Sequence, residues 1–384
     1  MAEGSSGPDD VPKASEPANR DADTTGGPTP VGTPLEGQNP NPLGLAFSTA
    51  PRPGLPPRWA TGGRDLSRLD GLGLAARLAR LAVVVILLVG AVLIAAVTVS
   101  GIGPPSKDDL IKQAGLLGKK QLLIGVKDDQ PGLSLLDKKT GEYQGFDVEI
   151  AYLVAAELGF AQDDVRFLSI ESEDRARRQA VDPSTGKTVT VDLVVATFSI
   201  TQAREKDPDV LFSAPYLRTE QSVLTKRPSK KIEALTDLAK QTVCTLNTTT
   251  SMLALQAAGD RPVGRNRISE CVEGLLNNTY DAVSTDAAIL AGFSHQYPKE
   301  LQLHDIGLET SEDYGINVGP NPALRTLVNL ALYKSLHDPS DRRWENAYDT
   351  YLLEEQSDAR PQQVAVARQP MVAKPKVRTW PWEG

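Results

Sequence analysis

The side chains most able to ligate a metal or attack a substrate are scarce in this 384-residue sequence. It contains two cysteines and three histidines, whereas a structural zinc site usually takes four ligands of these types. No histidine stands in a motif beside either cysteine, which disfavours a cysteine nucleophile, and no pair of acids suggests acid–base catalysis. These patterns predict a protein with no metal, no cofactor and no enzymatic reaction.

The charge balance disfavours nucleic acid as a partner. The sequence has 41 basic and 49 acidic residues, a net charge of −8, whereas nucleic-acid binders usually carry a basic surplus. Much of the acidic surplus lies in residues 1–50, where seven acids accompany two bases.

The N-terminal region has the composition of a disordered chain. Residues 1–63 contain twelve prolines and ten glycines, with few clustered apolar side chains. Such a stretch cannot bury enough surface to offset the entropy lost on ordering it. We therefore predict a disordered tail over 1–76, with a polyproline-type partner motif inside it as the alternative.

An uncharged run follows between Arg80 and Lys107. Its apolar part, residues 81–99, is nineteen residues long, and roughly 20 apolar residues span a bilayer as a helix. The run lacks the polar face of a helix in a soluble core. The pattern predicts an uncleaved transmembrane anchor over 77–103 that contacts lipid through 81–99. A cleaved signal peptide is the alternative, disfavoured because some 80 residues precede a long apolar run.

Positive charge around the anchor predicts its orientation. Lys107 and Lys112 follow the run closely, whereas six arginines precede it: Arg52, Arg58, Arg64, Arg68, Arg77 and Arg80. Since cytoplasmic flanks carry the excess of Lys and Arg, the N-terminus is expected in the cytoplasm. The chain is then a single-pass protein of the cell membrane, with everything after Gly103 outside.

Residues 105–353 have the pattern of a globular α/β domain. Strand-like runs rich in β-branched residues alternate with helix-like runs. Asp147 and Gly159 suit the N-cap and the C-terminal cap of one helix. The main runs are QLLIGV (121–126), FDVEIAYLVAAEL (146–158), VDLVVATF (191–198), TVCTLN (242–247) and YDAVSTD (280–286).

Both cysteines, Cys244 and Cys271, fall in the part assigned outside the membrane. An even pair in an oxidising compartment favours a disulfide. Closing a loop of about 27 residues would stabilise the fold by roughly 3 kcal/mol in the chain-entropy account. Two buried free thiols are the alternative.

Five motifs in order resemble those of the family 3 extracellular solute-binding proteins, the amino-acid receptors of ABC-type uptake systems. The resemblance covers about 250 residues, and its closest branch is the glutamate-binding one of high-GC Gram-positive bacteria, which also carries cysteines at these positions. The motifs are LLIGVKDDQPGLSLLDKKTGEYQGFDVEIAYLVAAELG (122–159), VDLVVATFSITQAREK (191–206) with FSAPY (212–216), TLNTTTS (245–251), YDAVSTDAAILAGF (280–293) and EDYGINVG (312–319).

The resemblance implies a periplasmic-binding-protein type II fold, in which two α/β lobes are joined by two crossing strands and close on a ligand by a hinge. Lobe 1 is expected over about 104–217 and 310–353, and lobe 2 over about 222–306. Residues 354–384 are predicted to be a disordered tail.

In the first lobe, the resemblance implies that Arg204 binds the α-carboxylate of an amino acid through its planar fork. Ser199 would offer its hydroxyl and N–H to the ligand, and Thr197 its carbonyl to the ammonium group. An exposed helix arginine is the alternative for Arg204, while Thr201 suits the cap of the helix that begins there.

In the second lobe, Thr249 and Thr250 match the turn whose N–H groups and hydroxyl meet the α-carboxylate at a helix start. The sequence departs from the family at Thr248, where relatives usually carry glycine. Asp286 matches the carboxylate that pairs with the ligand ammonium, and an ordinary N-cap is its alternative.

The stretch SEDR (172–175) resembles the segment that directs an arginine at the distal carboxylate in binders of acidic amino acids. Arg175 would pair with the ligand side chain and Ser172 would support it. The alternative is a solvated helix, because Arg175 belongs to a charge run with Glu173 and Asp174.

The resemblance thus implies a membrane-anchored extracytoplasmic receptor for glutamate or aspartate, with glutamine or asparagine as competitors. Its partners would be ABC permease subunits. The long N-terminal tail suggests an alternative, an amino-acid sensor that reports binding to a signalling partner. The segment 180–194 is longer than in relatives and predicts a hairpin turn within 183–190, either an inert loop or a lid or partner surface.

Overall fold

The structure is a computed structural model that describes residues 67–99, 103–306, 311–354 and 364–378. Most of the disordered tail predicted over 1–76 lies outside these residues. Helix α1 (Ser67–Val99) nevertheless includes residues 67–76, which differs from that prediction. Extending a helix costs less than nucleating one, so the apolar run extends its helix toward the N-terminus.

Helix α1 contains an apolar stretch, Gly73–Ala96, that is long enough to cross a membrane. It spans 24 residues, and none of its most apolar window is buried against protein. By length and composition this helix is a candidate membrane anchor. It starts four residues before the predicted anchor over 77–103, whose residues 100–102 lie outside the described residues.

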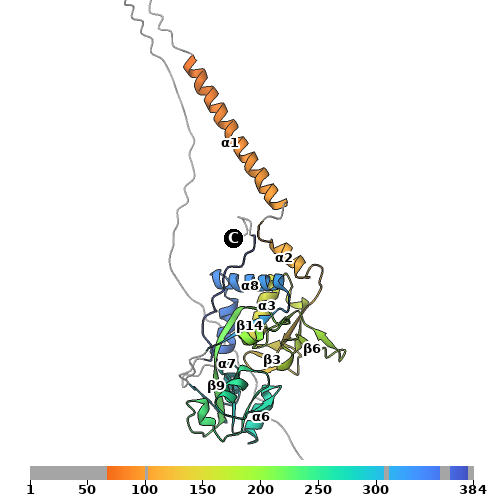
Figure 1. Ribbon diagram of the computed structural model, residues 1–384, viewed down its shortest axis with the longest axis vertical. Coiled ribbons are helices and arrows are strands. Elements are labelled where there is room, and N and C mark those ends of the chain that lie inside the picture. The colour runs from red at the N-terminus through yellow and green to blue at the C-terminus, as the bar shows by residue number, and fades with distance from the viewer. Residues whose placement is uncertain (1–66, 100–102, 307–310, 355–363, 379–384) are drawn as a thin grey trace, which may run out of the picture. The chain divides into compact units, whose positions relative to one another are not determined.

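The body after the anchor consists of two lobes that share one sheet (Figure 1). Among the described residues the sheet has nine strands, in the order β11-β10-β12-β9-β14-β8-β1-β5, with β13 paired to β9. Its two crossing strands are β9 (Phe212–Lys226) and β14 (Ser311–Asn317), which pair antiparallel. The predicted two-lobed α/β architecture is therefore confirmed.

Lobe 1 places parallel strands beside β14. The paired strands are β1 (Leu122–Val126), β5 (Val165–Ser169) and β8 (Leu193–Val194). A small sheet holds β2 (Asp129–Gln130), β3 (Ser134–Leu136) and β4 (Tyr143–Gln144). The helical elements are α2 (Lys107–Gln113), α3 (Phe146–Glu157), η1 (Gln162–Asp164), η2 (Ser172–Asp174), α4 (Gln202–Glu205), α8 (Pro322–His337), α9 (Arg343–Tyr348) and η4 (Asp349–Leu353).

Lobe 2 is smaller and is built between the two crossing strands. Its strands are β10 (Val243–Leu246), β11 (Val263–Arg265), β12 (Ala282–Asp286) and β13 (Leu301–His304). Its helical elements are η3 (Leu235–Leu238), α5 (Thr250–Ala257), α6 (Ile268–Leu276) and α7 (Ala287–Gln296). Cys244 on β10 and Cys271 on α6 form a disulfide, as predicted.

Asp147 does not cap helix α3, so this prediction is wrong. Gly145 holds the N-cap position at φ 132°, where an added Cβ would collide with the carbonyl oxygen of Leu133. Asp147 lies inside the helix and is fully buried. Its carboxylate accepts the backbone N–H of Thr197 at 3.0 Å and the hydroxyl of Tyr216 at 3.0 Å. A buried carboxylate with two donors is better placed there than at a solvated cap.

The segment 364–378 packs on lobe 1, which differs from the disordered tail predicted over 354–384. Val364, Ala365 and Val372 are buried. The Thr219 hydroxyl on β9 donates to the Val364 carbonyl at 2.6 Å, and the backbone N–H of Arg378 donates to the Pro105 carbonyl at 2.9 Å. The segment has no helix or strand periodicity, so its order comes from these contacts with distant parts of the chain. Residues 355–363 and 379–384 lie outside the described residues.

The long segment over 180–194 forms a hairpin of β6 (Gln179–Val181) and β7 (Thr188–Thr190). Its turn is closed by the Gly186 N–H, which donates to the Asp182 carbonyl at 2.7 Å. Asp182 also pairs with Arg166 on β5. The predicted hairpin is confirmed, and it projects from the edge of lobe 1 (Figure 1).

Candidate ligand-binding site

Arg204 connects the two lobes. Helix α4 begins after Thr201, whose hydroxyl accepts the backbone N–H of Arg204 at 3.2 Å, so the predicted Thr201 cap is confirmed. The Arg204 Nη1 donates to the Ser199 carbonyl at 2.7 Å, and Nη2 donates to the Thr248 carbonyl of lobe 2 at 2.9 Å. Its guanidinium lies 4.6 Å from the centre of the Phe198 ring. Arg204 is therefore held by lobe 1 and directed toward lobe 2.

Arg175 is turned inward, unlike its neighbours in the charge run. Its side chain is 2% exposed, whereas Arg177 is exposed and pairs with Asp174. The Arg175 Nε donates to the Ser172 carbonyl at 3.2 Å, and its Nη1 donates to the Thr197 carbonyl at 2.8 Å. A solvated helix is therefore the wrong description of Arg175, and the exposed Arg177 lies in the turn that follows η2.

The Arg175 guanidinium has no direct hydrogen bond to a carboxylate among the described residues. Its buried Nη2 has no hydrogen-bond partner among the described residues, and its recorded acceptors are backbone carbonyls. Burial, and the nearby positive charge of Arg204, lower the pKa of Arg175 to about 9. The acceptors of Arg175 are neutral carbonyls and Asp286 acts on it only from a distance, so an incoming carboxylate in direct contact would stabilise this group.

Two threonines beside the arginines have a left-handed backbone conformation. Thr197 has φ 46° and Thr248 has φ 57°. Such values are unusual for β-branched residues and concentrate at binding sites. Thr248 thus adopts the backbone that a glycine at this position would readily take, so the departure from the family pattern leaves a left-handed turn in place. The Thr197 carbonyl, expected to face a ligand ammonium, accepts a hydrogen bond from Arg175 instead.

Lobe 2 presents the start of helix α5 to the cleft. Thr249 is the N-cap: its hydroxyl accepts the Met252 N–H at 3.2 Å and donates to the Leu246 carbonyl at 2.7 Å. The Thr249 hydroxyl is thus engaged by the protein, while the half-buried Thr250 is the first helical residue. The N–H groups of a first helical turn favour an anion.

Asp286 ends strand β12 and stands before helix α7. It occupies the N-cap position, but its side chain makes no cap hydrogen bond. Its carboxylate accepts the Tyr314 hydroxyl at 2.5 Å and the Ser251 hydroxyl at 3.4 Å. Burial, and the negative charge of Glu312, raise the pKa of Asp286. A nearby cation would favour the charged carboxylate, which suits an ammonium ligand.

Three further polar groups lie near these residues: Lys127 and Gln130, which the resemblance places in the same region, and Tyr314, which was not predicted. Lys127 is 1% exposed and its Nζ donates to the Ile170 carbonyl at 3.1 Å and approaches the Ser172 hydroxyl at 3.4 Å. Gln130 accepts the Thr197 hydroxyl at 3.2 Å, and its Nε2 has no partner among the described residues. The position of Lys127 directly after β1 was the available signal, because ligands bind beyond the carboxyl ends of parallel strands.

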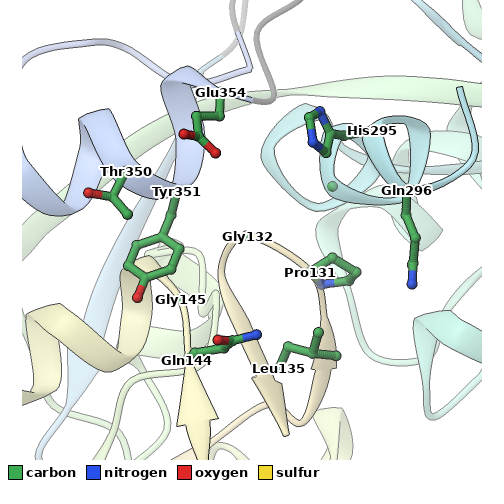
Figure 2. Close-up of a pocket in the computed structure, with 11 residues that line it drawn as sticks. Pro131, Gly132, Leu135, Gln144, Gly145, His295, Gln296, Thr350, Tyr351 and Glu354 are labelled. Atoms are coloured by element: carbon green, nitrogen blue, oxygen red, sulfur yellow. The ribbon is translucent and has the colours of Figure 1, made fainter. Parts of the chain in front are cut away.

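A pocket of about 380 Å³ lies apart from these residues (Figure 2). His295 and Gln296 of α7 lie across it from Tyr351 and Glu354, and the loop at Gly132 lies between them. None of the predicted site residues lines this pocket. The polar cluster around Arg175, Arg204 and Asp286 is therefore the better candidate for a charged ligand.

Two α/β lobes, two crossing strands and a polar cluster between the lobes define a two-lobed solute-binding protein. The sequence profile of the bacterial extracellular solute-binding proteins, family 3, matches residues 122–354. The chain belongs to this family, whose members are transport receptors.

The relatives whose names give a ligand are proteins that bind amino acids. The glutamate-binding protein GluB of Corynebacterium glutamicum is 29% identical over 264 residues, which are 67% of this chain and 87% of that protein. The ABC transporter glutamine-binding protein GlnH of Bacillus subtilis is 30% identical over 258 residues, 66% of this chain and 88% of that one. The solute receptor for L-cysteine of Neisseria gonorrhoeae has a TM-score of 0.56 and 25% identity, covering 66% of this chain and 98% of its own. The chain is accordingly an amino-acid-binding solute receptor.

Proposed function

We propose that this protein is a membrane-anchored extracytoplasmic receptor that binds glutamate or aspartate by closure of its two lobes and delivers it to an ABC-type permease. The observation that supports an acidic ligand most directly is the buried Arg175 guanidinium with its unpartnered Nη2. Arg175 and Arg204 can each take one carboxylate, and Asp286 can take one ammonium group. A ligand with two carboxylates and one ammonium group balances that set.

The proposed binding mode assigns each ligand group to one part of the cluster. The α-carboxylate takes the Arg204 fork together with the α5 start at Thr249 and Thr250. The ammonium group takes Asp286, with Ser199 nearby. The distal carboxylate takes Arg175, which the Ser172 carbonyl orients. No chemical step is part of this proposal, because each assigned residue only has to bind and orient the ligand.

Calorimetric titration of the full chain in detergent tests the ligand. Glutamate and aspartate should bind more tightly than glutamine and asparagine, and arginine should bind weakly, because it would place a cation beside Arg175. Tighter binding of glutamine than of glutamate would overturn the acidic assignment while leaving the receptor class intact. Absence of binding by all twenty amino acids would overturn the receptor proposal itself.

The proposed orientation rests on the arginines that precede α1, which favour a cytoplasmic N-terminus. Protease treatment of intact cells should digest the two-lobed body and spare a tag at residue 1. A digested tag would contradict a cytoplasmic N-terminus. Loss of α1 from the mature protein, measured by mass spectrometry, would contradict an uncleaved anchor.

A sensor is the second candidate, and the segment 364–378 favours it. The start of this segment contacts the crossing strand β9, where the Val366 N–H donates to the Arg218 carbonyl at 2.8 Å. Its last described residue, Arg378, donates to the Pro105 carbonyl and contacts Asp109 at 3.2 Å, and both partners follow α1 closely in the sequence. The segment thus connects the crossing strand β9 with residues 105 and 109, which follow α1 in the sequence.

Deletion of residues 1–63 separates uptake from sensing. If the protein is a transport receptor, uptake of labelled glutamate should persist and no other cellular response to glutamate should change. If uptake persists while a glutamate-dependent response disappears, the sensor becomes the preferred function.

A further inference from the structure

Arg267 of lobe 2 stands at the N-cap of helix α6, an unusual residue for that position. N-caps are usually Ser, Thr, Asp or Asn, because a short oxygen-bearing side chain can accept the free N–H groups of the first turn. Arginine has no acceptor, and Arg267 makes no cap hydrogen bond. Its side chain reaches lobe 1 instead.

On lobe 1, Arg267 meets Asp128 with two hydrogen bonds. Its Nη1 donates to one carboxylate oxygen at 3.2 Å and its Nη2 to the other at 2.5 Å. Glu171 of the same lobe adds a third contact at 3.5 Å. The Asp128 side chain is 15% exposed and that of Arg267 is 31% exposed, so the pair is partly shielded from solvent. Two-point pairs of this kind are the strong and directional ones.

The missing cap of α6 is supplied from lobe 1 by the neighbouring residue, Asp129. One oxygen of its carboxylate accepts both the backbone N–H and the hydroxyl of Ser269, each at 3.1 Å. Asp129 is 5% exposed, and its other oxygen has no partner among the described residues. The Ser269 N–H in the first turn of α6 therefore has this protein acceptor only while the two lobes are in contact.

Asp128 is oriented by hydrogen bonds that lie within lobe 1. The Ser169 hydroxyl donates to Asp128 at 2.8 Å, and Ser169 is itself hydrogen-bonded to the Tyr143 hydroxyl at 2.8 Å. These contacts lie within lobe 1. They orient the Asp128 carboxylate without help from lobe 2.

We propose that Asp128 and Asp129 of lobe 1, with Arg267 and Ser269 of lobe 2, form a latch that stabilises the closed arrangement of the lobes independently of any ligand. None of these four residues belongs to the ligand groups assigned above, so they are positioning residues. The latch sets how often the empty protein closes and how slowly a bound amino acid leaves. The inference rests on the two-lobed receptor class and not on the choice of glutamate.

The test measures the distance between the lobes in the full chain, purified in nanodiscs and free of ligand. Fluorophores are placed at the exposed positions of Lys187→Cys in lobe 1 and Lys299→Cys in lobe 2, with the native disulfide kept oxidised. Single-molecule energy transfer then reports the open and closed populations. Arg267→Ala should reduce the closed population of the empty protein about tenfold.

A matched control is Arg265→Ala, two residues away, whose partner Glu270 belongs to the same lobe at 3.8 Å. This variant should leave the closed population within about twofold of the parent. In the Asp128→Ala background, Arg267→Ala should have a much smaller further effect, because the two-point partner is already removed and only the Glu171 contact at 3.5 Å remains. Equal losses in both backgrounds, or an unchanged population in Arg267→Ala, would overturn the latch.

The kinetic readout separates a latch from a merely structural contact. With tritiated glutamate or glutamine, whichever the parent binds, Arg267→Ala should raise the dissociation rate about tenfold and change the association rate less than threefold. The charge exchange Asp128→Arg with Arg267→Asp should restore slow dissociation. If neither amino acid binds the parent, the ligand-free distance measurement still decides the latch. If Arg267→Ala does not fold, Arg267→Lys takes its place and should give a smaller shift in the same direction.

Discussion

The two lobes contribute opposite charges to the cleft. Lobe 1 carries the buried cations Arg175 and Lys127 and the half-buried Arg204, whereas lobe 2 carries the buried Asp286 and a helix start. At the latch the signs of charge are reversed, since the acids Asp128 and Asp129 lie on lobe 1 and Arg267 lies on lobe 2. Neither lobe alone can satisfy an amino acid, which bears both signs of charge. In the proposed binding mode, closure is part of recognition, because only the closed form would surround the ligand with both sets of charges.

The lobes also differ in what stabilises them. Lobe 2 has a disulfide between β10 and α6. Lobe 1 is covered by the segment 364–378, whose Gln369 Nε2 donates to the Leu332 carbonyl at 2.9 Å. The small lobe thus uses a covalent link, whereas the large lobe uses burial and backbone hydrogen bonds from the end of the chain.

The largest expected effect on binding comes from replacing Arg204, the cation that contacts both lobes. Arg204→Ala should weaken binding of every amino acid by about 2–5 kcal/mol, because a carboxylate would lose its charged partner inside a closed cleft. Calorimetry measures the change, and Arg177→Ala is the matched control because its partner Asp174 is at the surface. A Kd within threefold of the parent would show that Arg204 only supports the fold.

Removing the disulfide should affect lobe 2 and spare lobe 1. The double variant Cys244→Ser, Cys271→Ser should lower the free energy of unfolding by about 3 kcal/mol, the entropy of an open loop. Denaturant unfolding measures the total loss of stability, and hydrogen exchange shows which elements lose protection. Equal loss of protection in α3 and in α6 would contradict the separation of the two lobes.

Changing the specificity arginine should have a smaller and selective effect. Arg175→Gln should reduce the preference for glutamate over glutamine by at least about tenfold, or roughly 1.4 kcal/mol. The reason is that the lost guanidinium faces only the distal group in the proposed binding mode. Equal weakening of both ligands would refute the specificity assignment, and Arg177→Gln should change neither affinity.

The acid of lobe 2 should make binding depend on pH. Burial, and then the charge of Glu312, raise the pKa of Asp286 to about 7. The ligand ammonium needs the charged carboxylate, so binding below this pKa must first release a proton. The Kd should therefore rise by up to about tenfold for each pH unit below neutrality.

Asp286→Asn tests the source of that pH dependence. Burial raises the pKa of Asp147 to about 7 as well, but Asp147 is enclosed by Thr197 and Tyr216 within lobe 1. The variant should bind more weakly and lose the dependence on pH. A retained slope would assign it to Asp147 instead.

Local patterns were sufficient to predict much of the fold. Alternating strand and helix runs predicted the α/β lobes, and the five motifs indicated which segments would meet. The structure brings Arg204 and Asp286 of those motifs close to Arg175, while the role of each toward a ligand stays a proposal. Arg175 shows the limit of such patterns. A run of charges does not reveal which member turns inward, because that depends on the burial provided by other strands.

Features that depend on near neighbours could be predicted from the sequence: the apolar span of α1, the hairpin over 180–194 and the helix start at Thr250. The disulfide was the favoured expectation for an even pair of cysteines, with two free thiols as the alternative. Tertiary structure alone decided the contacts between distant residues. Asp147 is buried against Tyr216 and not used as a cap, and Val364 lies on Thr219, 145 residues earlier. Arg267 meets Asp128 across the lobes, 139 residues away. Such contacts leave no local periodicity in the sequence, since they arise only when the sheet brings both segments to the same place.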